Sequence, residues 1–569
     1  MPQNNNIFLG IWDGHDAGAA LIKDGKVLGA VNEERLSRRK LDAGFPSQSI
    51  NYLLGLISAR EKEKLTVCCS TYDFAKTITR IFPSLKEEYY LLRRRKKPPG
   101  KFSASKKLFK YYLTEIKGNW LTRLLSTKVL RNELKKIGIN NALHIVNHHL
   151  AHAASAAFTS GYERTLVVTV DGIGDAESGS IWKFENGLLT KLSSLPGHAS
   201  LGIFFEHVTN LLNMRELEDE GKVMALANYA FPVPDNQNPL KDLIQISGLK
   251  TTSTLGGPGM YYALKKILWS YPSEQFACMA QRVLEMKLIE LIKNAVNISG
   301  INNVAYAGGV ASNVKANMLI EHLPEVNKFY VFPHMGDGGL ALGAALAVAN
   351  NQVGLQKIAL PTLALGPEFS DKYIETVLTD CNKVTKLDNN ALSSEAAGLI
   401  ASGEIIFWFQ GRMEYGPRAL GQRSILARPD SVDIKNRLNL ILKKRVWYQP
   451  FCPSLLYEDA IHALENFSGT DNFFMTTAFK VTPGYRDKLA GVMNVDFTCR
   501  PHLVTERDDS RFLNLLYNIK KMTEVGAVLN TSLNLHGEPL VCSPQDAVKL
   551  FMQTDINYMF IGSFLVSKK

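Results

Sequence analysis

The chain has 569 residues, 46% hydrophobic and 21% charged, with a formal net charge of +11. These fractions are ordinary for a folded globular protein, and the length exceeds what a single core usually organises, so more than one domain is expected. The longest apolar run near the middle, 338–349, is rich in Gly and Ala and too short to span a bilayer.

The cysteines and the first residues predict a cytoplasmic protein. The seven cysteines are scattered, odd in number and without metal-ligand spacing, at positions 68, 69, 278, 381, 452, 499 and 542. This usage predicts reduced thiols and no disulfide framework. The first six residues are polar with uncharged side chains, unlike a secretory signal peptide.

A pattern of strand, Asp-Gly turn and hairpin occurs twice. A predicted strand over 7–12 leads into Asp13-Gly14-His15-Asp16, and hairpin strands follow at 17–22 and 27–31. The second copy has strands over 165–170, 179–184 and 188–192, with Asp171 ending the first of them. Two such units about 155–160 positions apart indicate a duplicated architecture. The repeat resembles the superfamily of actin, hexokinase and the heat-shock chaperone ATPases.

Two histidines lie between the repeats. Residues 143–146 predict a strand, Asn147 a helix N-cap, and 148–158 a helix on which His148 and His152 share one face. Such a pair alone is more often a surface or core feature than a metal site. Its missing partners are predicted to be Asp171 and Asp337, each at a turn. Two imidazoles and two carboxylates suit Fe(II), Zn or Mn better than Mg.

Glycine turns follow two further strands. A strand near 304–307 leads through Gly308-Gly309 to a helix over 313–321, and a strand over 329–333 leads to a helix over 340–349. Backbone N–H groups at such a helix start favour a phosphate or nucleotide edge. A tight packing turn between strand and helix is the alternative.

Glycine and proline residues near 354–367 interrupt regular secondary structure. They predict a linker over 356–368 between a first domain (1–355) and a second (369–569). A buried strand over 405–409 leads into a loop where glycines flank arginines. Lys443, Lys444 and Arg445 are expected on a helix, and a polar loop over 530–539 follows a strand over 527–529. Together with Arg500, these separated basic clusters favour a small phosphate ligand.

Several of these motifs occur in one order and jointly carry a resemblance: Asp13-Gly14-His15-Asp16, His148-His149-x-x-His152, Asp171-Gly172-x-Gly174-Asp175, Glu220-Gly221-Lys222, Gly308-Gly309 and Gly336-Asp337. The chain resembles the antibiotic and nodulation-factor O-carbamoyltransferases, whose N-terminal part is similar to the universal tRNA threonylcarbamoyl-transfer protein. The resemblance implies α/β and α+β architecture: a duplicated actin-like (ASKHA) domain followed by a YrdC-like α/β domain.

The resemblance also implies a reaction. The second domain would use carbamoyl phosphate and ATP with Mg²⁺ to make carbamoyl-adenylate, and the first domain would pass the carbamoyl group to a hydroxyl of a small-molecule acceptor. The activating residues would be Arg418, Lys443, Arg500, Asn530 and Ser532. The metal, Fe(II) or a similar ion held by His148, His152, Asp171 and Asp337, would act as Lewis acid.

Further roles are carried over from matching positions. His15, held between Asp13 and Asp16, would take or orient the acceptor hydroxyl proton. The adenylate would contact Lys40, Gly308, Gly309 and Asn313, and the acceptor would contact Asp13 and Glu220.

The second domain departs from the family pattern at one phosphate-binding position. Gln449 stands where an Arg is usual, and the loss of a charge-assisted bond costs on the order of 1.5–3 kcal/mol. Gln422 and Arg428 stand where Asn and Asp are usual.

Two other functions fit parts of the sequence. A tRNA threonylcarbamoyl-type transferase could use the basic stretch 93–110, although no aromatic residues interleave it in a regular way and we expect neither a nucleic-acid nor a membrane partner. A non-enzymatic nucleotide binder would leave His148 and His152 unexplained. The segment 228–271, expected near the acceptor, carries no code for acceptor identity, and oligomeric state is not encoded in any recognisable pattern.

Overall fold

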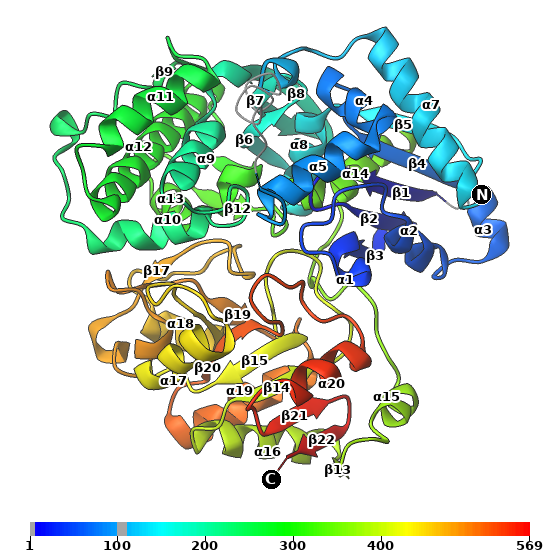
Figure 1. Cartoon of the computed structure of the whole chain (residues 1–569), viewed down its shortest axis with the longest axis vertical. Helices are drawn as coiled ribbons and strands as arrows, with labels where there is room; N and C mark the ends of the chain where they lie inside the picture. The colour runs from blue at the N-terminus through cyan, green and yellow to red at the C-terminus, as the bar shows by residue number, and fades with distance from the viewer. Residues whose placement is uncertain (1–5, 99–110, 569) are drawn as a thin grey trace. The chain divides into compact units, whose positions relative to one another are not determined.

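The computed structural model describes residues 6–98 and 111–568 (Figure 1). The chain forms two compact units: unit 1 comprises Met1–Glu33 and Leu41–Ala359, and unit 2 comprises Glu34–Lys40 and Leu360–Lys569. A short segment near the N-terminus therefore belongs to the C-terminal unit. The part of the basic stretch over 99–110 lies outside the described residues.

Unit 1 contains two five-stranded sheets with one topology. The first has the order β3-β2-β1-β4-β5, in which β1–β2–β3 is an antiparallel meander and β4 and β5 run parallel to β1. The second has the order β8-β7-β6-β11-β12 with the same directions. The predicted repeat of strand and hairpin is thus present as a repeat of strand order. The strands are β1 (Ile7–Trp12), β2 (Gly18–Lys23), β3 (Lys26–Asn32), β4 (Leu65–Ser70), β5 (Leu143–Val146), β6 (Arg164–Gly174), β7 (Glu177–Glu185), β8 (Leu188–Pro196), β11 (Asn303–Ala307) and β12 (Lys328–Val331).

Two central helices join these sheets. α8 (His148–Thr159) packs on β6 and α14 (Leu340–Val353) packs on β1, and the two helices contact each other (Figure 1). Small residues make this close approach feasible: a Cβ on Gly343 would lie 1.9 Å from the carbonyl oxygen of Ala151, and one on Gly10 would lie 1.7 Å from that of Ala341. α8 begins at the predicted metal ligand His148, and α14 follows the turn that carries Asp337, so the spacing of the two helices sets the geometry of that site.

Replacing Gly343 with Ala is therefore expected to destabilise the protein by about 3 kcal/mol, because the new methyl group forces α8 and α14 apart. Urea unfolding measures this change. Gly398→Ala is the control, since Gly398 lies within a helix and a Cβ there meets nothing within 4 Å. That control should gain about 0.5–1 kcal/mol. Equal behaviour of the two variants would contradict the close-packing argument.

The remaining elements of unit 1 surround this centre. Asn119 caps α7 through a reciprocal bond with Thr122, and α12 ends at Gly300, whose φ of +65° suits glycine. A short hairpin is formed by β9 (Gln245–Ser247) and β10 (Lys250–Thr252). The helices are α2 (Ser47–Leu54), α3 (Ala59–Glu63), α4 (Phe74–Ile81), α5 (Pro83–Arg93), α7 (Trp120–Lys136), α9 (Leu201–Leu211), α10 (Glu220–Leu226), α11 (Gly257–Leu268), α12 (Ser273–Ser299) and α13 (Val314–Glu321). α1 (Glu33–Ser37) crosses the boundary between the units.

Unit 2 is built on a mixed eight-stranded sheet of order β13-β22-β21-β14-β15-β20-β16-β19. The helices α16 and α19 pack together, and Trp408, Phe512 and Phe560 lie in the core that they share with the sheet. The strands are β13 (Lys383–Lys386), β14 (Ile406–Phe409), β15 (Arg423–Ala427), β16 (Cys452–Leu456), β19 (His502–Val504), β20 (Ala527–Ser532), β21 (Tyr558–Ile561) and β22 (Phe564–Ser567), with β17 (Phe479–Lys480) and β18 (Thr498–Cys499) paired separately. The helices are α15 (Asp371–Val377), α16 (Asn389–Ala401), α17 (Val432–Arg437), α18 (Tyr457–Ala463), α19 (Ser510–Thr523) and α20 (Pro544–Met552).

One local prediction for unit 2 is wrong. Lys443, Lys444 and Arg445 do not lie on a helix, because the π-helical segment that follows α17 ends at Leu442. Lys444 has a φ of +45° and breaks the helical path. The three basic residues therefore follow a helix end, where their side chains can diverge.

Candidate active site

Four side chains from distant parts of unit 1 converge on one point. His148 and His152 come from the first turns of α8, Asp171 from β6, and Asp337 from the turn before α14. The Nε2 atoms of His148 and His152 lie 3.0 and 3.2 Å from Asp171 Oδ2, and 3.6 and 3.5 Å from Asp337 Oδ1. One ligand atom from each residue falls within 4.8 Å of all the others. The structure thus brings together the quartet named from the sequence.

A second layer of contacts holds the quartet. The amide of Gly309 donates to Asp171 Oδ1 at 3.0 Å. Gly308 has a φ of +99°, and a Cβ there would lie 2.2 Å from the carbonyl oxygen of Val170, so only glycine permits this approach. Asp175 accepts from the His148 amide at 2.7 Å and fixes the start of α8. The Gly308-Gly309 turn, predicted to contact nucleotide, therefore orients Asp171.

The electrostatics of the quartet favour a cation. Burial opposes charge on His148, yet the nearby Asp337 and Asp171 carboxylates raise the pKa of this imidazole to about 9. Burial also opposes the charge of Asp171, but hydrogen bonds with His148 and His152 hold its pKa well below the usual range. Two imidazole nitrogens and two carboxylates fit a divalent transition metal such as Fe(II), Zn or Mn. The donor set, its burial and its second layer of contacts all agree with a metal centre.

His15 reaches the edge of this quartet. Its Nε2 lies 3.4 Å from Asp337 Oδ2, and its side chain is 42% exposed. Trp12 Nε1 donates to the His15 carbonyl at 2.8 Å, and the Trp12 ring packs edge-on against His148. His15 is thus tied to the quartet on one side and open to solvent on the other, a position suited to an incoming hydroxyl.

Asp13, predicted to hold His15 and to contact the acceptor, takes part in an internal ion-pair cluster. Its buried carboxylate accepts from Arg80 Nε and Nη2 at 2.8 and 2.9 Å and pairs with Lys76 at 2.9 Å. Burial opposes its charge, but Arg80 and Lys76 hold its pKa well below the usual range. Asp13 anchors the end of β1 to α4 through this internal ion-pair cluster, so it fixes the turn that carries His15.

Three other residues that were predicted to contact ligands form hydrogen bonds or an ion pair with nearby residues. Asn313 caps α13 by accepting from the Ala316 amide at 3.1 Å and also bonds Gln281. Glu220 opens α10 and accepts from the Leu217 amide at 2.6 Å, and burial raises its pKa to about 8. Lys40 belongs to unit 2 and lies 3.2 Å from Glu34 Oε1.

Unit 2 concentrates buried cationic groups at the end of its sheet. Arg418 Nε and Arg445 Nη2 are buried and have no hydrogen-bond acceptor among the described residues. Arg500 donates to the sulfur of Cys452 at 3.2 and 3.0 Å. Burial and the neighbouring Arg500 charge lower the pKa of Arg418 to about 9. Cations that repel one another and keep buried N–H groups without acceptors indicate a site for an anion.

Lys443 joins the polar loop after β20 to this region. Its ammonium group is buried and donates to Asn534 Oδ1 at 2.8 Å and to the backbone oxygen of Ser532. Burial and the Arg445 charge hold its pKa well below the usual range. Ser532 donates to Asn534 Oδ1 at 2.7 Å, and Asn530 Nδ2 donates to Ser454 Oγ at 2.8 Å. The structure thus links Lys443 and Ser532 directly.

The arginine loop is organised by a residue that the sequence analysis missed. Glu414 Oε1 accepts from the amides of Leu420, Gln422 and Arg423 at 2.9, 2.8 and 3.0 Å. Arg423 itself is fully buried, bonds backbone carbonyls and stacks on Phe409, so its role is structural. A carboxylate within an arginine-rich loop was the available signal for Glu414.

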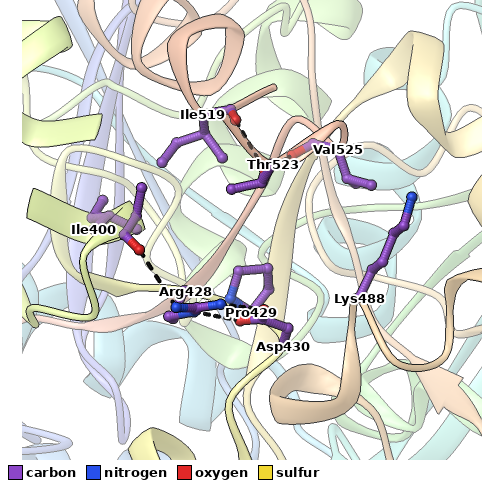
Figure 2. A pocket seen from close by; sticks show the side chains of 9 residues that line it. Ile400, Arg428, Pro429, Asp430, Lys488, Ile519, Thr523 and Val525 are labelled. Atoms are coloured by element: carbon purple, nitrogen blue, oxygen red, sulfur yellow. Dashed lines mark hydrogen bonds and ion pairs between the residues drawn. The ribbon is translucent and has the colours of Figure 1, made fainter. Parts of the chain in front are cut away.

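The departures from the family pattern have different surroundings. Arg428 forms a bidentate pair with Asp430 at 2.7 and 2.6 Å, beside a small pocket that Ile519 and Lys488 also line (Figure 2). The charge of Arg428 is therefore balanced by the carboxylate of Asp430. The side-chain oxygens of Gln449 and Gln422 are buried and lack a hydrogen-bond partner among the described residues.

Within the described ranges 6–98 and 111–568, no helix combines the length and the apolar composition needed to cross a membrane.

Comparison with known proteins finds family matches in both units. The family profile for the carbamoyltransferase N-terminus matches residues 8–346, and that for the carbamoyltransferase C-terminus matches residues 397–568. The uncharacterized proteins MJ1058 and MJ1051 of Methanocaldococcus jannaschii are 34% and 30% identical, over 82% and 99% of this chain and 80% and 100% of theirs. Nodulation protein NolNO of Sinorhizobium fredii is 32% identical over 98% of this chain and 79% of its own. The chain belongs to the carbamoyltransferase family.

Proposed function

We propose that this transferase is an O-carbamoyltransferase that makes carbamoyl-adenylate in unit 2 and transfers its carbamoyl group, in unit 1, to a hydroxyl of a small-molecule acceptor. The observation that carries the proposal is the group of buried, acceptor-free guanidinium nitrogens around Arg418 and Arg445 in a member of this family. Such a group fits phosphate oxygens, which carbamoyl phosphate and ATP both supply.

The activation half follows from the chemistry of carbamoyl phosphate. Water cleaves it to carbamate and phosphate, and the carbamate oxygen then attacks the α-phosphate of Mg-bound ATP and releases pyrophosphate. Arg418, Arg445 and Arg500 would hold the phosphate oxygens, and Lys443 would orient the Ser532 loop toward them. Because these cations are mostly shielded from water, they would also slow the loss of the reactive carbamate and its adenylate.

The transfer half requires an acceptor hydroxyl near the quartet. His148, His152, Asp171 and Asp337 would hold a divalent metal, which supplies Lewis-acid polarisation of the carbamoyl-adenylate. His15 would take the proton from the acceptor hydroxyl as its oxygen bonds to the carbamoyl carbon and AMP departs. The exposed side of His15 leaves room for the acceptor, while Asp337 on the other side stabilises the imidazolium.

The two halves are separable by experiment. Carbamoyl-phosphate-dependent exchange of labelled pyrophosphate into ATP reports activation without any acceptor. We expect Ser532→Ala to lower this exchange about 10–100-fold and His15→Ala to leave it unchanged. Lys444→Ala is the control for unit 2, because Lys444 is exposed beside buried Lys443. Exchange that needs no carbamoyl phosphate, or that survives unchanged in Ser532→Ala, would contradict the assignment.

A further inference from the structure

The helix α7 in unit 1 carries an apolar group on its outer surface. Trp120, Leu121 and Leu124 are 77%, 45% and 58% exposed. Ile116, in the non-helical segment before α7, is 44% exposed. The N-cap Asn119 fixes the start of the helix through its bonds to Leu121 and Thr122, so these side chains stand on an ordered turn. Exposed aliphatic and indole groups together at one helix end indicate a surface that meets an apolar phase.

The same outer face is basic along the rest of α7. Thr122, Ser126, Leu130 and Leu134 are buried at helical spacing and define the inner stripe. The opposite stripe continues from Trp120 and Leu124 into Lys128, Arg131 and Lys135, which are all exposed. Glu133 is the single acidic residue of α7, and it pairs with Lys136 at 2.7 Å on the flank of this face.

We propose that the outer face of α7, defined by Trp120, Leu121, Leu124, Lys128, Arg131 and Lys135, docks unit 1 on an anionic lipid surface. The first three side chains would enter the boundary between headgroups and acyl chains, and the three cations would contact anionic headgroups. Apolar insertion combined with a basic cluster is the arrangement that stable peripheral binding requires, since either alone binds weakly. This surface shares no residue with those assigned to carbamoyl transfer, and the proposal departs from the expectation that no membrane is contacted.

The composition favours lipid over nucleic acid as the partner. Lys128, Arg131 and Lys135 could meet phosphates of either kind. Leu121 and Leu124, however, offer neither a stacking plane nor a hydrogen bond to a base, whereas hydrocarbon accepts them directly. The two partners therefore differ in their response to removal of the leucines: lipid binding depends on both leucines, and nucleic-acid binding does not.

Vesicle sedimentation of the full chain tests the proposal. We expect binding to vesicles of equal parts phosphatidylglycerol and phosphatidylcholine at about 0.1 M salt, and weak binding to pure phosphatidylcholine. Since each Lys or Arg near an anionic surface raises partitioning about fivefold, Lys128→Gln/Arg131→Gln/Lys135→Gln should weaken binding about 100-fold. Leu121→Ser/Leu124→Ser should weaken it at least tenfold. Pyrophosphate exchange and the thermal midpoint should stay unchanged in both variants, because all substituted residues are exposed.

Trp269→Ser is the matched control. Trp269 is 93% exposed at the C-terminal end of α11, away from the outer face of α7, so this substitution should not alter vesicle binding. Equal binding to neutral and anionic vesicles, or undiminished binding of the leucine variant, would overturn the proposal. So would binding of duplex DNA at the same salt that depends on the cations and not on the leucines.

Discussion

Asp171→Asn is expected to remove the divalent metal and to lower carbamoyl transfer about a thousandfold or more, equivalent to roughly 4 kcal/mol of transition-state stabilisation. The substitution keeps the shape of the side chain, but an amide is a poor partner for a cation shared with two imidazoles. Asp171 Oδ2 is the oxygen that lies 3.0 and 3.2 Å from the two histidines. Carbamoyl-phosphate-dependent pyrophosphate exchange should continue, because its residues belong to unit 2.

Metal analysis of the purified variant and the exchange assay together check this result. His144→Ala is the matched control, since His144 is an exposed histidine on β5, shortly before the ligands of α8. It should retain full metal content and full activity. Undiminished metal in Asp171→Asn, or a fall in exchange as large as the fall in transfer, would place the metal elsewhere or give the quartet a purely structural role.

The sequence was sufficient for most of unit 1 because local signals and topology agree there. The predicted strand order repeats, and Asn147 marked the start of α8 as predicted. Asp13-Gly14 follows the end of β1, whereas Asp171-Gly172 lies inside β6, which continues to Gly174. His148, His152, Asp171 and Asp337 could be joined because each stands near the end of a strand or the start of a helix. The ends of neighbouring strands and helices meet at one edge of a sheet, so such positions converge in space.

Other features depended on contacts that no local pattern encodes. Asp13 lies in a conspicuous turn, but its partners Lys76 and Arg80 come from a helix more than 60 positions away. The helical segment that was expected to include Lys443 ends at Leu442, and Lys444 adopts a positive φ that no local pattern predicted. Glu414 was missed because its hydrogen bonds come from three backbone amides, which leave no signal in the sequence.

The second large effect concerns Arg418 in unit 2. We expect Arg418→Ala to lower carbamoyl-phosphate-dependent pyrophosphate exchange about 100-fold or more, since an Arg–phosphate contact contributes about 3 kcal/mol. The same variant should be as stable as wild type or more stable, by about 1 kcal/mol, because it removes a partly buried charge that Arg500 repels. A loss of function with a gain of stability separates a ligand-binding residue from a structural one.

Thermal unfolding with and without carbamoyl phosphate measures both parts of the Arg418 prediction. An anion bound only by the folded state raises the unfolding midpoint of the wild type, and this rise should vanish in Arg418→Ala. Arg437→Ala is the control: Arg437 is exposed and paired with Asp555, so both its exchange rate and its response to carbamoyl phosphate should match the wild type. If Arg418→Ala unfolded at a lower temperature and still responded to carbamoyl phosphate, the guanidinium would stabilise the fold and the anion would bind elsewhere. If the response vanished while the variant remained stable, the uncompensated charge in unit 2 would be explained by its ligand.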